Sequence, residues 1–247
     1  MGVAYLLRVY ADTSTVGYYS PLHRHLECAS LLPIPERRLE LSRAPMWLNP
    51  YFVRDPCTNL AMATFMPLGL EWVMHRDPRL DLGFYTEPLG RSGRLPRAVS
   101  RGWLLVLVSG LAVYPEGFWD RRRSRREILK AFREAMGSGR GGVYIVALME
   151  IEEVLEVRDW SRAPQELLQS PHSVLGEPVR AVLGDVMLVT PPIPLDAIAR
   201  GRLRERIERL ARGRFRVGRL GDLSEVLELV ERQATLRRLK ALNQSRS

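Results

Sequence analysis

The sequence predicts an α+β protein with a mixed or antiparallel sheet that curls toward a barrel and carries an inserted basic helix. Two long apolar runs flank a segment of helical periodicity, and the N-terminal residues add a further strand. Helical periodicity returns at the C-terminal end, where a helical pair is expected. With 247 residues, 46% hydrophobic and 26% charged, the chain has a globular composition and can bury a sizeable core.

Two apolar segments are expected to form the centre of the sheet. Trp103–Pro115 (WLLVLVSGLAVYP) predicts a buried strand with a glycine break. Val143–Val157 (VYIVALMEIEEVLEV) predicts a long strand or a strand pair, because its second half alternates apolar and acidic residues. Further strands are expected at Val3–Tyr10, at Leu70–Met74 and at Asp185–Thr190, the last one ended by two prolines.

The segment between the two apolar runs predicts an amphipathic helix with a basic outer face. Gly137 is expected to stop this helix. Its apolar positions follow helical spacing and are Ile128, Leu129, Phe132, Ala135 and Met136. A helix inserted between neighbouring strands follows from this order.

Two other stretches are expected to be irregular. Ala29–Pro56 is rich in proline, which removes backbone donors and disfavours helix, so only short edge strands are expected there. Turn-forming residues interrupt His75–Pro96 every few positions, which predicts a long exposed loop.

We expect residues 1–195 to form one α+β domain and residues 196–247 to form a C-terminal helical extension packed on it. Leu203, Ile207 and Leu210 make one apolar helical stripe. A second helix is expected to begin at Asp222, with Glu225 three residues later as in a capping box.

The net charge of +9 rests on 37 basic residues, of which only Lys130 and Lys240 are lysines. Arginine binds phosphates and guanine edges in a bidentate manner, so nucleic acid, either DNA or RNA, is the first partner to consider. Two alternatives stay open: a compositional bias toward arginine, and a thermophilic protein that uses arginine in surface ion pairs.

Cysteines and apolar runs argue for a cytoplasmic protein without a membrane partner. Cys28 and Cys57 do not make a disulfide scaffold in a chain of this length. The longest apolar run, Trp103–Val108, is too short to span a bilayer. His23 and His25 with Cys28 resemble part of a metal site, but a further ligand is not nearby, so we expect no metal and no cofactor.

RRRSRRE (Arg121–Glu127), preceded by Phe118 and Trp119, is the densest cluster of charge. Arginines beside exposed aromatic rings suit unpaired nucleotides, whereas the alternative is a solvated helix start. GSGRGG (Gly137–Gly142) runs from helix to strand, the reverse of a phosphate-binding loop. The residues expected to contact a nucleic-acid backbone are Arg121, Arg122, Arg123, Arg125, Arg126 and Arg140.

LLRVYADTSTVGYYSPL, followed by LLPIPE (Leu31–Glu36), resembles the opening of the nucleotide-modification-associated domain family, third type. HRDPRLD with FYTEPLG, the two core strands, and SPHSVLG with LGDVMLVT follow in the family's order over residues 3–190. The chain departs from the family at Gly102 and Trp103, where a Gly-Asp pair is usual. The core strands also resemble PUA-like barrels, including EVE and ASCH domains, which hold RNA or a modified base in a cleft.

The resemblance implies a protein linked to modified DNA or RNA bases, as a reader or as part of the modifying machinery. The opening loop is expected to line the cleft, with hydrogen bonds from its polar residues and a stacking face from Tyr18 or Tyr19. An ordinary turn or core role stays open for each position. The expected nucleotide-binding residues are Asp12, Thr13, Ser14, Tyr18, His23, Asp77, Tyr85, Thr86 and His172.

Three functions stay open at this point. The first is recognition of a modified or flipped-out nucleotide. The second is an enzyme that acts on a base with Asp12, Asp77 or His172 as acid/base groups, although no nucleophile motif surrounds Ser14 or Ser109. The third is a structural or partner-binding protein whose arginines form surface ion pairs.

Overall fold

The structure is a computed structural model that describes residues 3–11, 13–89, 95, 99–195, 217–232 and 235–239. These residues form a mixed α+β fold with one large mixed sheet, which confirms the predicted class. The chain divides into two compact units, each described by itself below. Unit 1 comprises Met1–Val9, Asp77–Val108 and Ile145–Ser247, and unit 2 comprises Tyr10–Arg76 and Ser109–Tyr144.

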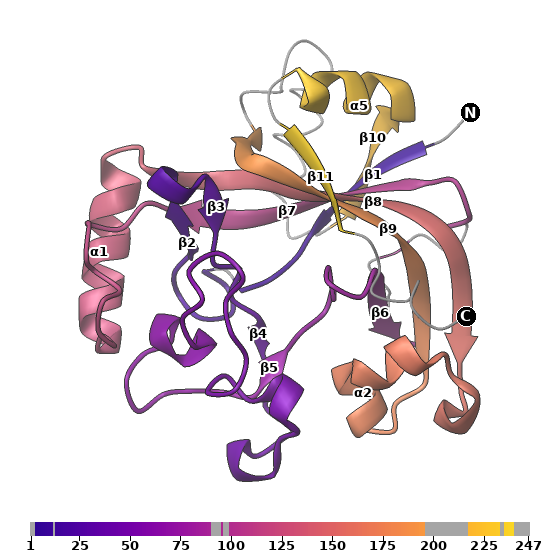
Figure 1. Ribbon diagram of the computed structural model, residues 1–247, viewed down its shortest axis with the longest axis horizontal. Helices are drawn as coiled ribbons and strands as arrows, with labels where there is room; N and C mark the ends of the chain where they lie inside the picture. The colour runs from indigo at the N-terminus through magenta and orange to yellow at the C-terminus, as the bar shows by residue number, and fades with distance from the viewer. Residues whose placement is uncertain are drawn as a thin grey trace. The chain divides into compact units, whose positions relative to one another are not determined.

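The sheet has the strand order β10-β1-β7-β8-β9-β11, and β6 also pairs with β9. Among the described residues the sheet has nine strands, two of which are described with unit 2. The other seven are β1 (Val3–Arg8), β6 (Phe84–Pro88), β7 (Leu104–Ala112), β8 (Gly141–Val157), β9 (Val179–Pro194), β10 (Val217–Asp222) and β11 (Thr235–Leu239). β1 and β7 are parallel, whereas β1 with β10, β6 with β9 and β9 with β11 are antiparallel. β8 and β9 bend strongly along their length (Figure 1).

Hydrophobic burial explains the strands predicted from the apolar runs. Every residue of β7 is buried, and the second half of β8 exposes Glu150, Glu152 and Glu153 while Ile151 is buried. In unit 1, Phe84 packs with Val157 and with buried residues of β9. The inserted helix α1 (Arg125–Gly137) joins β7 to β8, which are neighbours in the sheet, as predicted.

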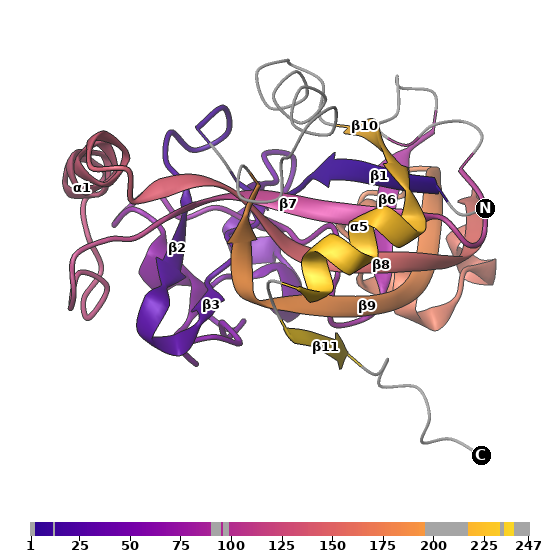
Figure 2. The same cartoon turned by 90° about the horizontal axis from the view of Figure 1, so that it is seen from above.

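Parts of the prediction for unit 1 are wrong. The stretch predicted as an exposed loop contains β6, which pairs with β9 from Phe84↔Leu183 to Pro88↔Val179 and is largely buried. At the C-terminal end, the second helix of the predicted pair is present and begins next to Asp222 as predicted, but two strands that the sequence did not predict flank it. The helix is α5 (Leu223–Glu231), and the strands are β10 beside β1 and β11 beside β9 (Figure 2). The first helix of the predicted pair lies outside the described residues.

Unit 1 also contains three short helical segments: η5 (Trp160–Arg162), η6 (Gln165–Gln169) and α2 (Pro171–Val174). Ser170 begins α2 by accepting a hydrogen bond from the His172 amide, and Pro171 occupies the first helical position. β9 continues through Pro191 and Pro192 to Pro194, so those prolines do not end the strand as predicted.

Unit 2 holds the proline-rich segment, which has only short elements, as predicted. Its strands are β2 (Ser20–His23), β3 (Cys28–Ala29), β4 (Ile34–Pro35) and β5 (Met74–His75), the last occupying the end of the strand expected at Leu70–Met74. β2 pairs with β3 and, through Ser20 and Pro21, with the end of β7, whereas β4 pairs with β5. Its short helices are η1 (Arg24–Leu26), η2 (Leu41–Arg43), η3 (Met46–Leu48) and η4 (Met62–Phe65).

The core of unit 2 packs α1 against residues of the opening loop and of the proline-rich segment. Four of the helix residues, Ile128, Ala131, Phe132 and Ala135, are buried in it, while the predicted Met136 is exposed. Tyr19 packs edge-on against Phe132 and also covers Gly110, where a Cβ would meet its ring at 2.3 Å. A glycine inside β7 is therefore required by the Tyr19 ring.

The sequence predicted no disulfide framework, yet the structure joins Cys28 and Cys57 in a single disulfide. Cys28 is consequently not a metal ligand beside His23 and His25. Among the described residues, no helix has both the length and the apolar character needed to cross a membrane.

Candidate functional site: an arginine-rich helix start beside an exposed tyrosine

The arginine segment leads into α1 and is organised by a capping box. Ser124 accepts a hydrogen bond from the Glu127 amide, and the Glu127 carboxylate accepts one from the Ser124 amide. Hydrogen bonds to its carboxylate from the Ser124 hydroxyl and from the Ser124 amide hold the pKa of Glu127 below its ordinary value. The Glu127 carboxylate also lies 3.5 Å from Arg121 and 3.6 Å from Arg123, so it offsets the basic helix start.

Two guanidinium groups at this helix start are exposed. Within the described part of the chain, Arg125 and Arg126 make no ion pair and no hydrogen bond through their side chains. The Arg125 guanidinium reaches the opening loop, where it lies 4.0 Å from the Cβ position of Gly17. The opening loop and the arginine segment, which are far apart in the sequence, are therefore neighbours in unit 2.

The aromatic residues predicted to accompany the arginines do not face solvent freely. Trp119 is buried and contacts the rings of Tyr114 and Phe65 at 5.0 and 5.5 Å. Phe118 stacks on Tyr114 and is covered by the Arg123 guanidinium at 4.9 Å from its ring centroid. Both rings thus stabilise the unit 2 core.

The exposed ring comes instead from the proline-rich segment. Arg122 lies over the Tyr51 ring at 5.6 Å and donates a 3.4 Å hydrogen bond to its hydroxyl, while pairing with Glu71. Tyr51 is 45% exposed, and the next residue, Phe52, is 64% exposed. The exposed Leu68 donates its amide to the Arg123 carbonyl at 2.8 Å.

We call this set the arginine–tyrosine surface: Tyr51, Phe52, Leu68, Arg122, Arg125 and Arg126. It combines a guanidinium already placed on an aromatic face with two exposed cations and with apolar side chains. Aromatic faces bind unpaired bases by stacking, and guanidinium groups bind phosphates. The set therefore has the chemistry needed to bind a single-stranded nucleic acid.

The predicted residues of the opening loop are not all accessible. Thr13 and Ser14 are exposed, whereas Asp12 lies outside the described residues. Tyr18 is fully buried and donates a hydrogen bond to the Phe65 carbonyl at 3.1 Å; burial raises its pKa. A base therefore has no exposed Tyr18 face on which to stack.

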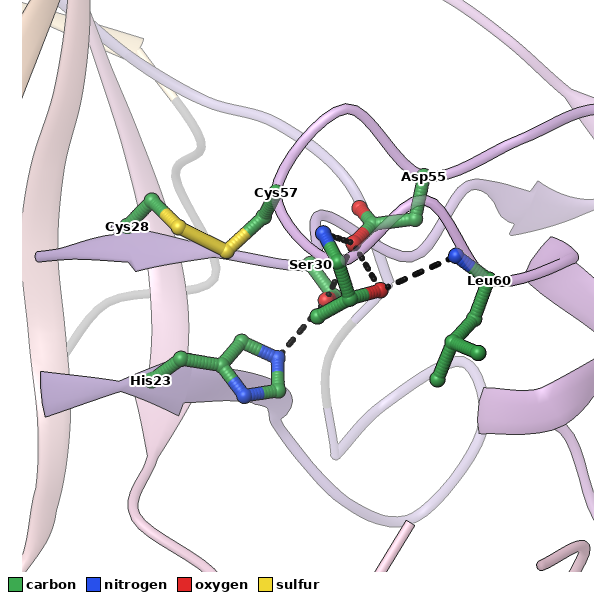
Figure 3. The surroundings of a disulfide bond; sticks show 7 residues. His23, Cys28, Ser30, Asp55, Cys57 and Leu60 are labelled. Atoms are coloured by element: carbon green, nitrogen blue, oxygen red, sulfur yellow. Dashed lines mark hydrogen bonds between the residues drawn. A yellow bond between two sulfur atoms is a disulfide. The ribbon is translucent and has the colours of Figure 1, made fainter. Parts of the chain in front are cut away.

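His23 belongs to a polar group beside the disulfide (Figure 3). Its Nε2 lies 2.8 Å from Ser30 Oγ, which donates a 2.8 Å hydrogen bond to Asp55. Because the serine proton is used on Asp55, the imidazole donates to the serine and is not its general base. Burial lowers the pKa of His23, which favours the neutral imidazole.

Unit 1 gathers three other predicted residues in a buried network. Asp77 accepts hydrogen bonds from both the amide and the hydroxyl of Thr86, and that hydroxyl lies 3.0 Å from Ser170. His172 has Glu177 at 2.9 Å from Nδ1 and Asp77 at 3.8 Å from Nε2. Tyr85, also predicted, is buried on the same strand as Thr86.

An imidazole between two carboxylates can pass a proton from one to the other, as acid/base chemistry requires. Asp77, Thr86, Ser170 and His172 are all buried, however, so a bound base would have to displace protein atoms. Buried polar groups joined by internal hydrogen bonds, as Asp77, Thr86 and Ser170 are, are typical of a structural network. The third acid/base residue of the sequence hypothesis, Asp12, is outside the described residues.

Several residues of these sites could not be predicted from the sequence. Tyr51 and Glu177 carry no motif, and Ser30 and Asp55 lie on different parts of the proline-rich segment that only the fold brings together. Two adjacent aromatic residues in a proline-rich stretch, Tyr51 and Phe52, are the sequence signal that points to the arginine–tyrosine surface.

Comparisons of the chain with protein-family models, with curated proteins and with solved structures find no match.

Proposed function

We propose that this protein binds nucleic acid through the arginine–tyrosine surface and that unpaired or flipped-out bases stack there. The single observation that carries the proposal is the Arg122 guanidinium over the exposed ring of Tyr51. Arg125 and Arg126 supply positive charge along the same helix start, and the net charge of +9 favours association with a polyanion.

The resemblance of residues 3–190 to the nucleotide-modification-associated domain family supplies the biological setting of this proposal. On that basis the bound base is modified, or belongs to a nucleic acid that the protein's partners modify. A PUA-like barrel, with a cleft for such a base, is part of the same proposal. The buried Asp77–His172 network is assigned to stability and not to chemistry.

The test replaces the aromatic ring and measures binding by fluorescence anisotropy of a labelled oligothymidylate of about 20 nucleotides, longer than one stacking site. Tyr51→Ala is expected to weaken binding about tenfold or more, because one base–ring stack is lost. Tyr51→Phe keeps the ring and should bind within about twofold of the parent protein. Equal affinities for the parent and Tyr51→Ala would contradict the proposal.

A further inference from the structure

The disulfide closes the loop that carries the tyrosine of the arginine–tyrosine surface. Cys28 on β3 and Cys57 are 29 residues apart, and Tyr51 and Phe52 lie between them. The enclosed residues form only short helices and two-residue strands. Within residues 43–53, backbone amides donate to carbonyls three or four positions earlier. Such local hydrogen bonds do not tie the enclosed loop to the rest of unit 2, so its conformation depends in part on the links at its ends.

A second link joins the same two segments. Ser30, two residues after Cys28, donates its hydroxyl to Asp55, two residues before Cys57 (Figure 3). The same Asp55 oxygen accepts hydrogen bonds from the amide and the hydroxyl of Thr58 at 2.8 and 2.7 Å. The covalent and the polar link thus act in parallel on one turn.

The Ser30–Asp55 link buries a carboxylate, which is unfavourable, and the disulfide holds the turn closed in spite of it. Asp55 is 1% exposed, and its other oxygen, Oδ1, is buried without a hydrogen-bond partner among the described residues. A buried carboxylate oxygen without a donor favours any conformation that hydrates it. Without the disulfide, opening of the Asp55–Thr58 turn would bring water to this carboxylate.

Opening of the Asp55–Thr58 turn would loosen the backbone on both sides of Tyr51. The Asp55 amide donates to the Leu60 carbonyl, and Met62 and Ala63 donate to the carbonyls of Val53 and Pro50. These hydrogen bonds hold the residues on both sides of Tyr51. A loop fixed before binding loses less conformational entropy when the ligand arrives, so a loosened loop binds more weakly.

We infer that the Cys28–Cys57 disulfide acts as a redox latch. By this we mean that the arginine–tyrosine surface binds nucleic acid with high affinity while the disulfide is intact and more weakly once it is reduced. The inference rests on the proposed function. In the reaction, two thiol groups of a reductant, such as the two of one dithiothreitol molecule, give up two electrons and two protons. They become one disulfide, while Cys28 and Cys57 become free thiols. Both cysteines are partly exposed, so a thiolate can reach the bond.

The test compares the full chain in its oxidised state, after reduction by dithiothreitol, and after removal of the reductant with reoxidation. Anisotropy of the labelled oligothymidylate is measured in each state, and a thiol titration confirms the redox state. Reduction is expected to weaken binding about tenfold by loosening the loop, and reoxidation should restore the affinity. Hydrogen exchange of the 46–58 amides should accelerate in the reduced protein.

The variant Cys28→Ser with Cys57→Ser should bind like the reduced protein and should not respond to dithiothreitol. Binding that is present but unchanged by reduction, with exchange of the 46–58 amides also unchanged, would overturn the latch and leave the proposed function in place. Absence of binding in the oxidised protein would overturn both. Accelerated exchange without a change in affinity also overturns the latch, since the loop would then move without consequence for the ligand.

Discussion

At the residue scale, Glu36 shows how one buried carboxylate organises the start of the proline-rich segment. Arg38 donates to it from the side chain at 2.8 and 2.9 Å and from the backbone at 3.0 Å, and His75 lies 3.0 Å away. Burial alone would raise the pKa of Glu36, but the hydrogen bonds from Arg38 and His75 outweigh it and hold the pKa well below the ordinary value of 4.5.

Because the folded-state pKa of Glu36 lies below its unfolded value, the ionised carboxylate stabilises the fold. This contribution is complete above about pH 4.5 and is lost as the pH falls further. Glu36→Gln is expected to lower the free energy of unfolding by about 2 kcal/mol at neutral pH, measured by urea denaturation. It should also flatten the decline of stability below pH 4.5.

Glu40→Gln is the matched control, since Glu40 is exposed and its ion pair among the described residues is with the exposed Arg43 at 3.4 Å. Its effect should stay below about 0.5 kcal/mol. If the two variants lose equal stability, or if Glu36→Gln keeps the acid-dependent decline of the parent, the role assigned to Glu36 is wrong.

Leu31–Glu36 is part of the family resemblance, but the sequence does not show what Glu36 contacts. The partners of Glu36 include His75, which lies 39 positions away, and only the β4–β5 pairing brings them together. Tyr51 and Arg122 are 71 positions apart, and no periodicity links them. Residue types that suit nucleic acid could thus be recognised from the sequence, but the particular ring could not.

At the element scale, β7, β8 and α1 were predictable because burial dictates their residue patterns. All nine residues of β7 are buried, and the helix buries one face at regular spacing. β6 was missed because its segment is rich in turn formers, and the polar Asp77 and Thr86 satisfy each other inside the protein. Polar residues in such a segment predict solvent exposure, but here they form internal hydrogen bonds.

The close approach of β8 and β9 gives a prediction at this scale. A Cβ at Gly184 on β9 would lie 1.9 Å from the Glu150 carbonyl oxygen on β8. Gly184→Ala forces two backbones apart and is expected to cost about 3 kcal/mol in urea denaturation. Gly137→Ala is the control, since nothing lies within 4 Å of that Cβ position and its φ is ordinary. An unchanged denaturation midpoint for Gly184→Ala would contradict this pairing of β8 and β9.

At the scale of the whole molecule, the α+β class and the inserted helix followed from the sequence, whereas the ends of the sheet did not. β10 and β11 come from a C-terminal segment whose leucines also fit a helix, and pairing with β1 and β9 decided their structure. Tertiary pairing overrides local propensity in such segments. The excess of arginine was visible from composition, but its placement at the start of α1 beside Tyr51 required the fold.

The salt dependence of binding tests most directly the proposed contact of Arg125 and Arg126 with phosphates. In a plot of log affinity against log salt concentration, Arg125→Ala with Arg126→Ala should make the slope shallower by about 1.4, or about 0.7 for each lost phosphate contact on a single strand. Arg158→Ala with Arg162→Ala removes the same charge from exposed ion pairs with Glu156 and Asp159 and should leave the slope unchanged. Equal slopes for the two double variants, or an affinity independent of salt in the parent protein, would contradict the proposed contact.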